Sequence, residues 1–217
     1  MKIVFSKYHG AGNDFILIDD FAENFPADNN ELIRGLCDRR FGIGADGLML
    51  LRSSAALDFS MLYFNADGHE GSMCGNGGRC LAAFALERGY VSTQKDIIFS
   101  AVDGEHRAHF RGETIVCLQM RDVAKIQKKG HGFCVDTGSV HHVEYVDNLV
   151  DIDICRRGRA LRRHPMYAPS GCNVNFIKME TDGSLSIRTY ERGVENETLA
   201  CGTGSVAARA NRLQPSV

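Results

Sequence analysis

The chain has 217 residues and a mass of 23.9 kDa, and its 44% hydrophobic content can bury the core of one large domain or two small ones. Its formal net charge of -2 and pI near 6.4 provide no basic field for nucleic acid and no polybasic patch for a membrane surface. No apolar run approaches the roughly 20 residues of a spanning helix, and the first residues have no cleavable signal pattern. We therefore expect a cytoplasmic globular protein.

Eight cysteines are spread thinly over this mid-sized chain, whereas a disulfide-stabilised domain is usually small and dense in cysteine. We therefore expect reduced thiols. No CxxC pair occurs and the histidines show no HxxxH spacing, so the sequence predicts neither a metal site nor a metal cofactor.

Short apolar runs separated by Gly, Asp and Asn predict strands over 2–8, 14–20, 46–52, 57–65, 96–102, 114–120, 141–147, 173–179 and 184–190. Residues 31–40 and 77–88 have the length and the Leu/Ala content of helices. The elements together predict an α+β fold. The Lys/Gly-rich stretch at 125–132 is linker-like, so we expect a domain of residues 1–128 followed by one of residues 129–217.

An internal repeat links the two parts of the chain. CGNG begins at Cys74 and CGTG begins 127 residues later at Cys201, and at the same offset Tyr63 answers Tyr190 and Glu70 answers Glu197. Each cysteine follows a strand-like run and a polar loop, and precedes a segment of small residues. We therefore predict two pseudo-symmetric halves that meet at a cleft, each with strands around a central helix.

The position of the two cysteines indicates acid/base chemistry. A cysteine at a helix N-terminus lies near unpaired N–H groups and the positive end of the helix dipole, which favours the thiolate. Neighbouring glycines let a carboxylate approach those N–H groups. One thiol on each face of an α-carbon could remove a proton and return it with inversion. The alternative is that both cysteines are small packing residues at tight turns.

Several motifs in order carry a resemblance to a known family: KYHGAGNDFILID, RRFGIGADG, FNADGHEGSMCGNGGRC, TGSVHHV, NVNF and YERGVENETLACGTGS. With these motifs the chain resembles the diaminopimelate epimerase family over nearly its whole length. The resemblance implies cofactor-independent interconversion of LL- and meso-2,6-diaminopimelate, a step of lysine and peptidoglycan precursor synthesis. It also implies a fold of two α/β halves, with one catalytic cysteine at the start of each central helix.

The resemblance also implies roles for individual residues. Cys74 and Cys201 match the two acid/base cysteines, and His141 and Glu191 match a pair linked to catalysis beside the thiols. Residues that match substrate-binding positions are Asn13, Asn65, Gly75, Asn76, Asn173, Glu191, Arg192, Gly202 and Thr203. An arginine fork such as that of Arg192 suits the distal carboxylate. No metal, pyridoxal phosphate or nucleotide cofactor is implied.

Some positions depart from the family pattern. Gly47 stands where some members have glutamine, Ser139 where many have asparagine, and Val140 in place of the usual proline. By the repeat, counterparts of the strands after the Cys74 helix would fall beyond residue 217. We therefore expect the second half to lack its final strands, with exposed apolar surface or partner contacts around residues 201–217.

Two alternatives to the epimerase stay open at this point. One is a related two-cysteine amino-acid racemase, such as one acting on proline, although a monocarboxylate would need no second anion site at Arg192. The other is a truncated fragment without activity. The expected partner is a small-molecule substrate, with no nucleic acid and no membrane, and a homodimer is compatible with the sequence.

Overall fold

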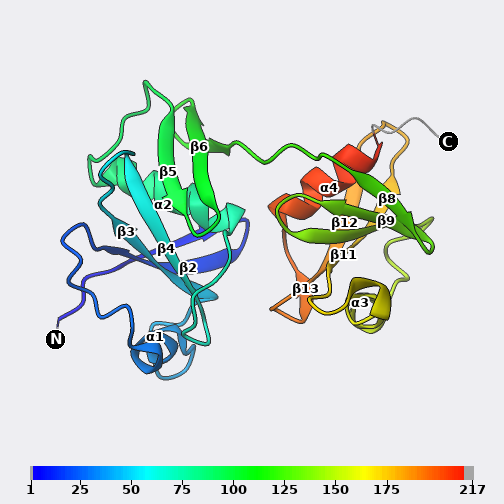
Figure 1. The fold of residues 1–217 in the computed structure, drawn as a ribbon, viewed down its shortest axis with the longest axis horizontal. Helices are drawn as coiled ribbons and strands as arrows, with labels where there is room; N and C mark the ends of the chain where they lie inside the picture. The colour runs from blue at the N-terminus through cyan, green and yellow to red at the C-terminus, as the bar shows by residue number, and fades with distance from the viewer. Residues whose placement is uncertain (1, 213–217) are drawn as a thin grey trace. The chain divides into compact units, whose positions relative to one another are not determined.

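The computed structural model describes residues 2–212 and has an α+β fold (Figure 1), as the sequence predicts. Its elements form two compact units, Met1–Gln119 and Met120–Val217, called here unit 1 and unit 2. Each unit contains one sheet. The expected division between residues 128 and 129 stays a prediction.

Unit 1 contains a seven-stranded sheet whose spatial order is the chain order. Its strands are β1 (Ser6–Gly10), β2 (Asn13–Asp19), β3 (Gly47–Arg52), β4 (Phe59–Asn65), β5 (Ile97–Ala101), β6 (Gly104–Arg111) and β7 (Ile115–Leu118). The pairs β2–β3 and β4–β5 are parallel, and the other neighbours are antiparallel. The sheet thus combines hairpins with two crossovers, and each crossover contains a helix.

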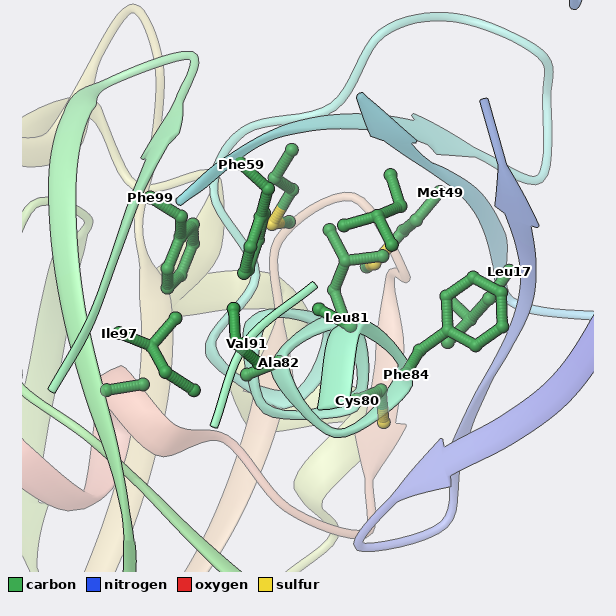
Figure 2. Packing of buried hydrophobic residues seen from close by; sticks show 14 of the residues in the cluster. Leu17, Met49, Phe59, Cys80, Leu81, Ala82, Phe84, Val91, Ile97 and Phe99 are labelled. Atoms are coloured by element: carbon green, nitrogen blue, oxygen red, sulfur yellow. The ribbon is translucent and has the colours of Figure 1, made fainter. Parts of the chain in front are cut away.

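The crossover helices of unit 1 cover opposite faces of the sheet. Strand β2 alternates between them, since Phe15 and Leu17 pack into the cluster around α2 (Gly75–Glu87). Ile16 and Ile18 pack into the cluster around α1 (Asn30–Cys37). Figure 2 shows the apolar side chains of β2–β5 gathered around α2. This burial holds the helix that begins directly after Cys74.

Unit 2 contains a six-stranded sheet in the order β13-β12-β11-β10-β9-β8. Its strands are β8 (Ile126–Lys129), β9 (Gly132–Asp136), β10 (Val140–Tyr145), β11 (Asn173–Met179), β12 (Leu185–Glu191) and β13 (Asn196–Thr198). Among the strand pairs described in unit 2, β10–β11 is parallel and the others are antiparallel. Helix α4 (Gly202–Arg212) packs on β9–β12, while α3 (Ile154–Arg162) and the short 3-10 helix η1 (Pro165–Tyr167) pack on the opposite side.

The predicted repeat is present in the topology. The series β1-β2-α1-β3-β4-α2 has the same order, strand directions and covered faces as β9-β10-α3-β11-β12-α4. One pairing of the predicted repeat is wrong by one residue. Tyr63 packs on the α2 face of its sheet, whereas Tyr190 packs with the α3-side cluster, so Tyr63 corresponds to Thr189 and Phe64 to Tyr190.

On the C-terminal side of the central helix, unit 1 continues with strands β5–β7 after α2. In unit 2, α4 ends at Arg212, the last of the described residues. Residues 213–217, which belong to the segment predicted to be exposed or to contact a partner, lie outside the described residues. Beside α4 is a hollow of about 230 Å³ lined by Leu185, Ile187, Ser205, Ala208 and Arg209.

Several elements were not predicted from the sequence. Strand β6 alternates polar and apolar residues, β8 has one apolar residue, and the apolar run of β9 is only three residues long. Helix α3 is rich in arginine, and its Gly158 lies against Tyr190, where a Cβ would be 2.4 Å from the Tyr190 Cβ. Helix α1 ends at Cys37, three residues early, because the Asp38 carboxylate accepts hydrogen bonds from the N–H groups of Arg40 and Phe41 and turns the chain.

Candidate active site

In unit 1 the predicted catalytic Cys74 is the residue that caps the start of α2. Its backbone is extended (φ -114°, ψ 115°), its carbonyl accepts the hydrogen bond of Gly78 N–H, and its side chain does not cap the helix. The thiol is half-buried and adjacent to the first turn, where N–H groups have no partner within the helix. Close packing requires the glycines after it, since a Cβ on Gly77 would be 1.7 Å from the Met49 Cε.

Asn13 lies beside this thiol at the start of β2. Its Oδ1 is 3.7 Å from the Cys74 Sγ and 3.4 Å from the Asn76 Nδ2, and both can donate to it. Its Nδ2 donates to the Asp46 Oδ2 at 2.7 Å. The Asp46 carboxylate is in turn bound by the Arg39 guanidinium at 2.7 Å. The Asn13 carboxamide therefore has one determined orientation, with its oxygen toward the thiol.

The remaining predicted residues of unit 1 are Gly75, Asn76 and Asn65. Gly75 and Asn76 form the first residues of α2, and Asn76 Oδ1 accepts from Arg79 Nη2 at 2.6 Å. Asn65 is the exposed last residue of β4. The structure thus brings Asn13, Cys74 and Asn76 into mutual contact, and it shows no such contact for the Asn65 side chain among the interactions described.

In unit 2 the predicted catalytic Cys201 directly precedes α4. Its carbonyl accepts hydrogen bonds from the N–H and Oγ of Ser205, both at 3.0 Å. Its Sγ lies 3.4 Å from the Thr203 Oγ1. Burial raises the pKa of the Cys201 thiol, and the Glu191 carboxylate raises it further, against hydrogen bonds from Thr203 and Gly204 that lower it. The position at a helix end predicted a stabilised thiolate here, and burial outweighs that effect.

His141 lies in the centre of unit 2, on β10, with no exposed surface. Its Nδ1 is 2.7 Å from the Asn175 Oδ1. Burial lowers the pKa of His141 to about 4, although the hydrogen bond to Asn175 acts in the opposite direction; the nearby Arg192 charge lowers it as well. The imidazole is therefore neutral at pH 7.

Asn173, Glu191 and Arg192 meet where β11 and β12 pair. Asn173 Nδ2 donates to the Ser139 Oγ at 2.9 Å, and its Oδ1 accepts from the Arg192 N–H at 2.8 Å. Glu191 Oε2 accepts from the Thr198 Oγ1 at 2.8 Å. Ser139, which departs from the family pattern, thus still anchors the amide of Asn173.

The predicted site residues therefore lie in two groups, one in each unit. Asp46 and Asn175 contact predicted residues, and Thr189 contacts Asn175, but none of the three was predicted. The signal for Asn175 was in NVNF, where two polar residues alternate with apolar ones on a buried strand and so share a face. Asp46 and Thr189 had no such signal.

Within residues 2–212 no group of three or more His, Cys, Asp or Glu side chains could hold a metal ion. Over the same residues, no helix has both the length and the apolar character needed to cross a bilayer.

Comparison with known proteins identifies the family of the chain. The family model described as diaminopimelate epimerase matches residues 5–123 and 133–216. The chain is 47% identical to the diaminopimelate epimerase of Flavobacterium psychrophilum over 201 residues, which cover 93% of this chain and 78% of that protein. It is 48% identical to the diaminopimelate epimerase of Chlorobaculum tepidum over 204 residues, which cover 92% of this chain and 79% of that protein.

Solved structures with lower identity share the fold. A phenazine biosynthesis protein of the PhzF family from Bacillus anthracis superposes with a TM-score of 0.72 at 17% identity, covering 97% of this chain and 80% of that one. A probable proline racemase from Agrobacterium radiobacter superposes with a TM-score of 0.70 at 17% identity, covering 100% of this chain and 79% of that one. The motifs, the family model and the identity to the curated relatives agree: the chain belongs to the diaminopimelate epimerase family.

Proposed function

We propose that the protein interconverts LL- and meso-2,6-diaminopimelate by proton transfer at one α-carbon, with Cys74 and Cys201 as the two acid/base groups. The observation that carries the proposal is the equivalent placement of the two thiols. Each cysteine directly precedes a helix, α2 or α4, and these two helices pack on equivalent faces of the sheets of their units. Relatives named diaminopimelate epimerase support the choice of substrate.

The reaction proceeds through one thiolate and one thiol. The thiolate removes the α-proton, the electron pair of the C–H bond passes to the α-carbon and its carboxylate, and the thiol on the opposite face delivers its proton to that carbon. The protonation states of the two sulfurs are thereby exchanged. The raised pKa of Cys201 favours its protonated form at the start, so Cys201 acts as the donor when the cycle begins with the Cys74 thiolate.

The carboxylate next to the reacting carbon binds the N–H groups at Gly75 and Asn76 and at Gly202 and Thr203. Helix N-termini are suited to this because their dipole and free N–H groups favour an anion, and the same donors stabilise the charge that develops during deprotonation. Arg192 binds the distal carboxylate, which distinguishes this substrate from a monocarboxylic amino acid.

Two measurements test the proposal together. In deuterium oxide the wild-type protein should incorporate deuterium at the α-position of LL- or meso-diaminopimelate while the isomers interconvert. Cys74→Ala and Cys201→Ala should each reduce net epimerisation by roughly a thousandfold or more, because each direction needs both groups. Cys117→Ala, which removes a half-buried thiol of β7, is the matched control. Near-normal turnover by either single variant in both directions would contradict the mechanism.

The second candidate is a two-cysteine racemase for a monocarboxylic amino acid such as proline, which the fold similarity to a probable proline racemase supports. Turnover of proline with none of diaminopimelate would favour it. Arg192→Lys separates the two, since it should raise KM for diaminopimelate by about tenfold or more through loss of the bidentate fork. A cytoplasmic location and a homodimer are further parts of this proposal.

A further inference from the structure

A buried chain of hydrogen bonds crosses three adjacent strands of unit 2. It joins His141 of β10 to Asn175 of β11 at 2.7 Å, and Asn175 to Thr189 of β12 at 2.7 Å. The three residues are 0%, 0% and 3% exposed. All three lie on the sheet face that α4 covers, because they alternate with residues of the α3-side cluster. The chain is therefore shielded from water along its whole length.

The donors and acceptors in this chain determine where the hydrogens are. Asn175 Nδ2 donates to the Thr189 Oγ1, so the amide oxygen Oδ1 is the atom that faces His141. An amide oxygen only accepts, and therefore the His141 Nδ1 must carry a hydrogen. In a neutral imidazole the other nitrogen, Nε2, then has a free lone pair. With Asn175 in this orientation, its Nδ2 bound to Thr189 and its oxygen toward the imidazole, His141 takes the Nδ1–H tautomer.

The second observation is at the opposite end of the imidazole. His141 Nε2 is buried and has no hydrogen-bond partner within the described residues. An unpaired buried polar atom is costly and therefore uncommon in folded proteins. Here the unpaired atom is a proton acceptor, on a residue that the family resemblance links to catalysis.

The chain also touches the start of the helix that follows Cys201. A Cβ added to Gly204 would lie 2.5 Å from the Asn175 Nδ2 and 3.3 Å from the Cys201 Cβ. Asn175 therefore packs directly against the first turn of α4. The glycine leaves space for its amide, and the contact limits the room in which that amide can turn.

We propose that Asn175 and Thr189 are positioning residues that hold His141 as the neutral Nδ1–H tautomer, so that its Nε2 lone pair accepts a hydrogen bond or proton at the substrate site. Neither residue needs to touch the substrate. The tautomer itself follows from the hydrogen bonds, and only the group that Nε2 serves depends on the proposed function.

The tautomer is measured directly by ¹⁵N NMR of protein with labelled histidine, through long-range couplings between imidazole nitrogens and ring protons. At pH 7 the wild-type His141 should show a protonated Nδ1 and an unprotonated Nε2. Thr189→Val removes the acceptor for Asn175 Nδ2 at nearly constant volume, which frees the amide to rotate and present Nδ2 to His141. The spectrum should then show loss of the Nδ1–H form. Thr189→Ser keeps the hydroxyl and should keep the wild-type spectrum.

Kinetics provide the second readout. Thr189→Val should lower kcat by about 10- to 100-fold, the range expected for one lost buried hydrogen bond, with KM changed by less than about threefold. Thr189→Ser should restore most of the rate. Thr181→Val, a matched change at an exposed threonine of the β11–β12 turn, should leave both constants and the spectrum unchanged.

The outcomes separate this inference from the proposed function. An Nε2–H tautomer or an imidazolium in the wild type at pH 7 would overturn it without any variant. The same follows if Thr189→Val, shown to be folded by circular dichroism, keeps the Nδ1–H form and the kcat of Thr189→Ser. If Thr189→Val does not fold, Asn175→Leu applies the same test from the other side of the hydrogen bond. A wild-type protein with the Nδ1–H form but no epimerase activity would refute the proposed function and leave the tautomer assignment intact.

Discussion

The layer beneath the central helix differs between the two units, although the order and directions of the surrounding strands are the same. In unit 1, Met49 lies under Gly77. Its register partner on the neighbouring strand β4 is Tyr63, whose ring packs edge-on against Phe15. In unit 2, the equivalent positions are Asn175 under Gly204, Thr189 and His141. An apolar layer in one unit thus corresponds to a hydrogen-bonded layer in the other.

This difference shows how a duplicated fold can divide its tasks. The apolar layer around Met49 is part of the cluster that anchors α2 (Figure 2) and contributes burial free energy without any need for partners. The polar layer stabilises only where each group is satisfied, and it leaves the His141 Nε2 unpaired among the described residues. We infer that unit 1 holds its cysteine mainly by packing, and that unit 2 contributes the tuned acid/base groups.

The largest expected effect comes from making unit 1 resemble unit 2. Met49→Asn removes a fully buried side chain and introduces an amide without partners, so it should lower the free energy of unfolding by about 3 to 5 kcal/mol. Hydrogen exchange read by mass spectrometry should show the loss in α2 peptides and not in α4 peptides. Met49→Leu is the control and should cost less than about 1.5 kcal/mol. Equal loss of protection in both helices would contradict separate layers.

The second prediction concerns the pH dependence of stability. The pKa of His141 is lowered to about 4 in the folded protein, whereas an unfolded histidine titrates near 6.5. Between these values the unfolded state binds more protons, so the free energy of unfolding should fall as the pH drops from about 6.5 to 4, by up to about 3 kcal/mol from this residue.

His141→Phe, which copies Phe15 of unit 1, should remove that part of the pH dependence. Urea unfolding at several pH values measures it. The buried His142, whose pKa burial also lowers, stays in both proteins, so the difference between the two slopes isolates His141. Parallel slopes for the two proteins would show that His141 is not held neutral.

The third prediction compares the two helix glycines. A Cβ on Gly77 meets the end of the flexible Met49 side chain, which can adjust. Gly77→Ala should therefore lower the free energy of unfolding by about 1 to 3 kcal/mol and leave kcat nearly unchanged. A Cβ on Gly204 meets the Asn175 amide, which is held by two hydrogen bonds. Gly204→Ala should therefore displace Asn175 and lower kcat about tenfold. Equal activity of the two variants would remove the distinction between the layers.

The smallest expected effects concern the partners of the two predicted substrate-binding asparagines. Asp46 accepts from Asn13 in unit 1, and Ser139 accepts from Asn173 in unit 2. Asp46→Ala and Ser139→Ala should each raise KM by about three- to tenfold, with the larger change for Asp46 because a charged acceptor binds an amide more strongly. Initial-rate kinetics with both diaminopimelate isomers measure this. A lower kcat at constant KM would place the two residues in the chemical step instead.

Much of the architecture could be predicted from the sequence. Turn residues between apolar runs predicted most of the strands that carry the core of each unit, and the repeated CGxG motif predicted the two central helices and the equivalence of the units. These features are local, because a period of two, a glycine after a cysteine or an internal offset can be read without knowing what lies nearby. The motifs also identified the family.

Other features were decided by tertiary structure. Helix α3 has little apolar character and forms where Gly158 lets it pack against Tyr190. The pKa of Cys201 is raised because burial and Glu191 outweigh the helix end, which the position before a helix could not reveal. The one-residue shift that makes Thr189 the counterpart of Tyr63 depends on strand register. The role proposed for Asn175 and Thr189 needs atoms from three strands to meet, and such contacts between residues far apart in sequence leave no pattern along a single chain.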